Sequence, residues 1–194
     1  MQILGLSDST PRTEGRLKAL FWPTIRNDGD LEYITEQGFW VCFIVAVLTL
    51  VFNVFTRSLL LGGLDCLFYF LAGVGVRQRS NVAAITAFVA YVLAWFVIQR
   101  YTGNGFSVIR LIFSALLLSN IRGIWLSSRW EKTAEGEAAP PRLNQTIFDK
   151  LSDQLPPRIW PAAKWVFGFV AAIEIALLLM FLTAPLPPAM LRGK

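Results

Sequence analysis

Apolar residues gather in five runs separated by shorter polar connections, and this pattern predicts the architecture of the chain. The runs cover residues 38–55, 58–76, 81–98, 106–126 and 165–183. Each run is close to the roughly 20 residues that an α-helix needs to cross about 30 Å of hydrocarbon. The sequence therefore predicts an all-α polytopic membrane helix bundle with about five transmembrane helices and short interfacial amphipathic helices.

The segment ahead of the first run combines a basic amphipathic stretch with a turn. Residues 12–21 place leucine and phenylalanine on one side of a helix, which Pro23 is expected to end. Carboxylates alternate along residues 27–32, but the calcium-loop signature is incomplete there. We expect instead a turn followed by Asp30 as the N-cap of a helix that leads into the first run.

The long connection between the fourth and fifth runs has two parts. Residues 133–141 consist mainly of Ala, Glu, Gly and Pro, a composition typical of a flexible linker. Residues 143–155 then repeat apolar side chains at helical spacing, and Pro156 and Pro157 are expected to end that helix. Two interpretations remain open: a helix that lies on the membrane surface, and a helix that docks a partner protein.

The runs divide the chain into four parts, none of which reaches the roughly 50 residues of an independent soluble domain. They are a cytoplasmic N-terminal segment (1–37), a four-helix transmembrane bundle (38–126), a cytoplasmic linker with an amphipathic helix (127–164), and a fifth transmembrane helix with a short outer tail (165–194).

Composition supports the membrane assignment and excludes several chemistries. The chain is 55% hydrophobic and 16% charged, against about 45–50% and about 25% in soluble domains. It has no histidine, which excludes histidine-ligated metals and imidazole-based catalysis. Its two cysteines, Cys42 and Cys66, each lie in an apolar run and form no Cys-x-x-Cys motif. We therefore expect no catalytic, cofactor-binding or metal site and no enzymatic activity.

Positive charge predicts the orientation. Most of the 18 lysines and arginines lie in the connections that share a side with the N-terminus. Because cytoplasmic loops are enriched in these residues, we expect the N-terminus in the cytoplasm and the C-terminus outside, in the plasma (inner) membrane. Contact with the lipid bilayer explains the net charge of +5 without nucleic acid. On this orientation the acceptor motif at Asn144 stays unglycosylated.

Charged residues inside the apolar runs are the candidates for function, since charge in a membrane span is costly. They are Asp65, Arg110 and Glu174. Similar estimated depths predict an Asp65–Arg110 ion pair. Tyr69 shares the helical face of Asp65, and Ser114 shares that of Arg110. No partner for Glu174 is evident from the sequence. Each charge is compatible with a structural role or with a solute or proton path.

Small residues mark a contact surface on the last run. Gly168, Ala172 and Ala176 recur at four-residue spacing, a pattern typical of helix contacts in membranes. Glu174 lies about 200° around the helix from Ala172, and so on another face. The stripe predicts contact with another membrane protein or with a second copy of the chain.

Three functions are compatible with these features. The first is a non-enzymatic accessory, assembly or scaffold component that binds another membrane protein. The second is a small oligomeric transporter or channel that uses Asp65, Arg110 and Glu174. The third, an intramembrane enzyme, is disfavoured because the acidic groups lie on separate helices without a nucleophile or a set of metal ligands.

Overall fold

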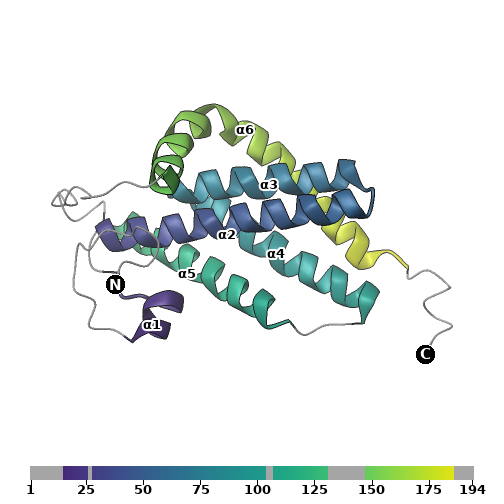
Figure 1. Cartoon of the computed structure of the whole chain (residues 1–194), viewed down its shortest axis with the longest axis horizontal. Helices are drawn as coiled ribbons and strands as arrows, with labels where there is room; N and C mark the ends of the chain where they lie inside the picture. The colour runs from purple at the N-terminus through teal and green to yellow at the C-terminus, as the bar shows by residue number, and fades with distance from the viewer. Residues whose placement is uncertain (1–14, 26–27, 104–106, 131–146, 186–194) are drawn as a thin grey trace.

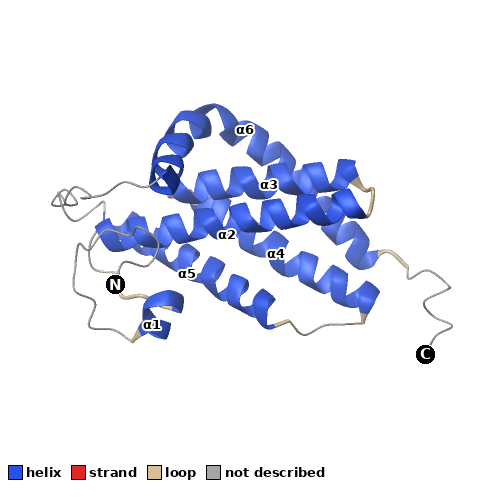
Figure 2. Cartoon of the chain, in the orientation of Figure 1, coloured by secondary structure: helices blue, strands red, loops and turns tan. Residues whose placement is uncertain are grey.

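The computed structural model describes residues 15–25, 28–103, 107–130 and 147–185 (Figure 1). Within them all regular structure is helical (Figure 2). The helices are α1 (Arg16–Phe21), α2 (Asp28–Phe55), α3 (Leu59–Arg77), α4 (Asn81–Thr102), α5 (Val108–Trp130) and α6 (Ile147–Thr183). The predicted linker 133–141, the acceptor Asn144 and the start of the predicted helix 12–21 lie outside the described residues.

Five of these helices are long and apolar enough to cross a membrane, as the sequence pattern predicts. The candidate spans are Asp30–Phe55, Leu59–Arg77, Asn81–Thr102, Val108–Ser127 and Leu151–Thr183. The first begins well ahead of residue 38. Since α2 already starts at Asp28, Asp30 lies inside its first turn, and the prediction that Asp30 caps this helix is wrong.

Tight turns make α3 an antiparallel neighbour of α2 and α4 an antiparallel neighbour of α3. Between α3 and α4, Arg79 adopts the left-handed region with φ 58°, and the Ser80 side chain accepts a hydrogen bond from the Ala83 amide. That bond satisfies one of the amides that the first turn of a helix leaves without a partner. Arg57, also at positive φ, forms the turn from α2 to α3. Gly103, at φ 70°, ends α4.

The helices α2, α3, α4 and α5 form a ring in which each packs against two neighbours. The neighbouring pairs are α2 with α3, α3 with α4, α4 with α5, and α5 with α2. Helix α6 lies against α3 and α4, and α1 packs on α5 (Figure 1). Consequently α3 and α5 are diagonal in the ring and share no extensive contact.

Aromatic rings and alanines fill the centre of the bundle. Phe68 of α3 and Phe167 of α6 stack with their ring centroids 5.9 Å apart. The alanine side chains of α4 at positions 83, 87 and 90 are fully buried, which lets α3 and α6 approach that helix closely.

Glycines bring α3 close to its neighbours. A Cβ added at Gly75 would lie 2.5 Å from both the Ala83 Cβ and the Trp160 ring. One added at Gly62 would lie 2.2 Å from the Asn53 Cβ. These distances are shorter than any van der Waals contact, so the helix approaches its neighbours where side chains are absent.

Helix α6 continues through Pro156, Pro157 and Pro161, and the prediction that the first two prolines end it is wrong. Its 37 residues correspond to about 55 Å of helix, well beyond the about 30 Å of a hydrocarbon core. Figure 1 shows the amino-terminal part of α6 arching before the helix runs along α3. Prolines remove backbone donors and bend a helix, and the bend is compatible with continuity when other groups satisfy the free carbonyls.

The neighbours Gly62 and Gly63 give a matched test of this packing, because nothing lies within 4 Å of a Cβ added at Gly63. We expect Gly62→Ala to lower the free energy of unfolding by about 1–3 kcal/mol through overpacking. Gly63→Ala should leave it unchanged or raise it by up to about 1 kcal/mol, the helix-propensity gain. Unfolding in mixed detergent micelles measures both, and equal effects would contradict the packing of α3 on α2.

Candidate functional site

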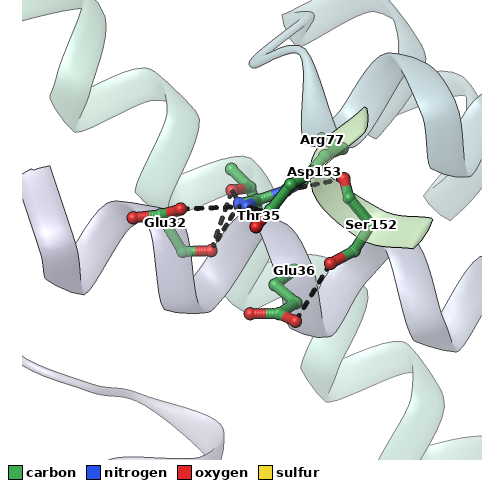
Figure 3. A network of polar contacts seen from close by, with 6 residues as sticks. All are labelled: Glu32, Thr35, Glu36, Arg77, Ser152 and Asp153. Carbon is green, nitrogen blue, oxygen red and sulfur yellow. Dashed lines mark hydrogen bonds and ion pairs between the residues drawn. The ribbon is translucent and has the colours of Figure 1, made fainter. Parts of the chain in front are cut away.

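A buried arginine joins three helices at one end of the bundle (Figure 3). Arg77 is the last residue of α3. Its Nε donates to the carbonyl oxygen of Ser152 at 3.2 Å. Its Nη1 donates to the carbonyl oxygen of Glu32 at 3.0 Å and to Thr35 Oγ1 at 3.1 Å. The guanidinium therefore links α3 to α2 and to the start of α6.

Two ion pairs complete the coordination of this guanidinium. Its Nη2 lies 3.0 Å from Glu32 Oε1 and also bonds to Asp153 Oδ1. The Arg77 side chain is only 7% exposed, whereas those of Glu32 and Asp153 are 33% and 29% exposed. A guanidinium has five N–H donors, and the contacts here match all of them. Because each donor has an acceptor, these contacts offset the free-energy cost of burying the charge.

A second hydrogen bond extends the network. The Ser152 hydroxyl donates to Glu36 Oε1 at 3.2 Å, and both residues are buried. Sequence reasoning assigned the charges here to connections and surfaces, so it missed this site. A usable signal was present: Pro156 follows Ser152 by four residues and cannot donate to its carbonyl.

Asp65 and Glu174 form a carboxyl pair between α3 and α6. The two side chains lie close enough together to act electrostatically on each other. Glu174 is buried and Asp65 half-buried. Because a carboxylate has no donor, a hydrogen bond between them would require a proton on one of the two groups. The buried Tyr69 lies within electrostatic reach of both. Three of the five predicted polar candidates thus come together.

The predicted Asp65–Arg110 ion pair does not form among the described residues. The two residues lie on α3 and α5, which are diagonal in the ring. Arg110 instead acts electrostatically on Tyr91 of α4. The Ser114 hydroxyl is buried and has no hydrogen-bond partner within the described part of the chain. Similar depth did not predict which charges meet, because depth does not determine which helices are neighbours.

Polar side chains also lie buried between α2 and α5. Asn120 donates through Nδ2 to the Leu116 carbonyl at 3.1 Å, while its Oδ1 has no partner among the described residues. The Asn120 amide packs directly on the backbone of α2, because a Cβ added at Gly38 would lie 2.3 Å from it. No group of three or more metal-ligating side chains occurs in the described ranges.

The small-residue stripe of α6 points away from the other described helices. Gly168, Ala172 and Ala176 are exposed, and a Cβ added at Gly168 meets nothing within 4 Å. Glu174 is 4% exposed. The prediction that the stripe and Glu174 occupy different faces is confirmed.

Comparison with known proteins assigns the chain to no group. No family model matches it, and neither a curated protein nor a solved structure does. Its function is therefore inferred from its own residues.

A double-mutant cycle distinguishes the two possible partners of Asp65. We expect Asp65→Ala and Glu174→Ala to show a coupling energy of about 0.5–3 kcal/mol, because the residues are in contact. Asp65→Ala and Arg110→Ala should be additive within about 0.3–0.5 kcal/mol, since they lie apart. The measurement is the free energy of unfolding in mixed detergent micelles. Coupling to Arg110 without coupling to Glu174 would reverse the assignment.

Proposed function

We propose that the chain is an integral membrane protein that crosses the bilayer five times. The length and apolar character of the five helices support this. So does their outer surface, where Phe55, Leu60 and Trp165 are 82%, 86% and 79% exposed. Large apolar surfaces of this kind are unfavourable in water and favourable in lipid.

We further propose that the end of the bundle with the Arg77 network faces the cytoplasm, in the plasma (inner) membrane. Arg77 and Arg79 close α3 at this end, and Arg122 of α5 donates to the Pro23 carbonyl there at 3.0 Å. The opposite end holds Arg57 and Arg100. The larger basic content of the first end supports an N-terminus inside and a C-terminus outside.

Within the membrane we propose a non-enzymatic accessory, assembly or scaffold role, exercised by binding another membrane protein. The observation that supports it is the outward direction of the Gly168, Ala172 and Ala176 face. Helices in lipid associate through van der Waals packing, which small residues improve by letting backbones approach.

The internal use of small residues in the same chain supports this interpretation. Gly62 and Gly75 of α3 each meet a neighbouring helix where a side chain would not fit. The face at Gly168 has the same residue types and no neighbour among the described helices. A transmembrane helix of a second protein would fit there as α2 fits against Gly62.

The charged side chains of Arg77, Asp65 and Glu174 support the same conclusion, because each of them already has a structural contact. Arg77 is fully engaged in joining α2, α3 and α6. Asp65 and Glu174 lie close to each other between α3 and α6. A structural role accounts for each of these contacts, and the outward face of α6 is then the feature that remains for a partner.

Native mass spectrometry after gentle extraction tests this role. We expect the wild-type chain to retain a stoichiometric foreign membrane protein, and Gly168→Leu to lose it because the leucine keeps the backbones apart. Gly63→Leu is the matched control, since Gly63 is equally open on another helix, and it should retain the partner. A monomer, a homo-oligomer, or retention in Gly168→Leu would contradict the proposal.

Proton-coupled transport is the second candidate, and the Asp65–Glu174 pair is the observation that favours it. Two carboxyl groups that lie close together inside a bundle resemble the acidic positions of proton relays. A path would also need polar groups that connect this pair to both ends, and the buried polar side chains near Asn120 lie between α2 and α5 instead. We therefore place transport second.

A flux assay separates the two candidates. On the accessory proposal, vesicles that contain the purified chain should conduct protons no faster than protein-free vesicles, because the carboxyl pair is a structural contact. Asp65→Asn should leave this background unchanged. A proton or solute flux in the wild type that Asp65→Asn abolishes would favour transport.

A further inference from the structure

The contact between Arg77 and Ser152 repairs a defect that a proline introduces into α6. In an α-helix the N–H of each residue donates to the carbonyl four residues earlier. The carbonyl of Ser152 would accept a hydrogen bond from the N–H of residue 156. Residue 156 is a proline, which has no N–H. Because Ser152 and Pro156 are both buried, the Ser152 carbonyl needs a donor from the protein in place of water. Arg77 Nε supplies the missing donor at 3.2 Å.

The same guanidinium attaches this part of α6 to another helix. It pairs with Asp153, the neighbour of Ser152, and with Glu32 of α2. Figure 3 shows the arginine reaching between the two helices, with Ser152 bonded to Glu36 beside it. Ser152 and Asp153, which precede the prolines, are thus held to α2 and α3 by polar contacts.

Beyond the prolines α6 is held in a different way. A Cβ added at Gly75 would lie 2.5 Å from the Trp160 ring, so this ring fills the space beside α3. The Trp160 and Phe167 centroids are 5.6 Å apart, and Phe167 stacks on Phe68. This packing is apolar and buried, and it fixes the longer part of α6 to the bundle.

The prolines therefore lie between a polar attachment and an apolar one. Pro157 also removes the donor to the Asp153 carbonyl, so two successive helical hydrogen bonds are missing here. Bends in helices concentrate at such positions. The arching of α6 in Figure 1 lies in its amino-terminal part, which contains them.

We propose that residues 151–155 form a hinged arm, that Arg77 is the latch that holds it against α2 and α3, and that it swings about Pro156 and Pro157. The carboxylates of Glu32 and Asp153 are about one-third exposed, so water can reach these two acceptors of the latch. When the Arg77 contacts break, the arm moves while the longer part of α6 stays packed. This device is independent of the accessory role and would operate in a transporter as well.

Hydrogen exchange on the full-length chain in lipid nanodiscs tests the latch. We expect the backbone amides of residues 151–155 to exchange about 10-fold faster in Arg77→Gln and in Asp153→Asn than in the wild type. Residues 165–183 should keep their protection in both variants. Arg158→Gln removes a charge from an exposed position on the same helix, and it should exchange like the wild type.

Restoring the missing donor provides the second part of the test. Pro156→Ala returns an N–H to the Ser152 carbonyl, so the effect of Arg77→Gln should be smaller in that background than alone. Three results would overturn the proposal: no change at 151–155, an equal rise at 165–183, or an Arg77→Gln effect undiminished by Pro156→Ala. If Arg77→Gln fails to fold, the comparison of Asp153→Asn with Arg158→Gln decides.

Discussion

A buried guanidinium must find a hydrogen-bond acceptor for every donor, and Arg77 imposes that requirement on half of the bundle. Its acceptors lie 42 to 76 residues away in the sequence, on α2 and α6. Removing any of these acceptors would leave a buried donor of the charged group without a hydrogen bond. The free-energy penalty of such a donor exceeds what most single contacts contribute. The junction of α2, α3 and α6 is therefore specified by polar geometry, while the rest of the bundle is specified by shape.

Shape acts mainly through small residues. Gly62 and Gly75 let α3 approach its neighbours where no side chain would fit, and Trp160 occupies the space beside Gly75. At Gly168 the same residue type faces outward with nothing close to it. The absence of a side chain thus lets helices pack closely inside the bundle, and at Gly168 it leaves an open surface on the outside. That contrast is the observation on which the proposed accessory role is based.

Helix α6 combines both kinds of attachment. Its longer part is fixed by Phe167 and Trp160, and its amino-terminal arm by the Arg77 network. The carboxyl pair of Asp65 and Glu174 joins the longer part to α3 as well. Most of α6 is packed against apolar neighbours, whereas its amino-terminal arm is held by polar contacts that water can replace. Such a helix is suited to change conformation at that end without disturbing the bundle.

The sequence by itself determined the all-helical class, five apolar helices and the separation of Glu174 from the stripe at Gly168, because hydrophobic length and the 100° turn per residue are local properties. Tertiary structure decided which charges meet. Asp65 lies near Glu174 instead of Arg110 because helix order, which no local pattern encodes, places α6 beside α3 and α5 across the ring. It also decided that α6 continues through Pro156, since the donor that replaces the missing amide comes from a different helix.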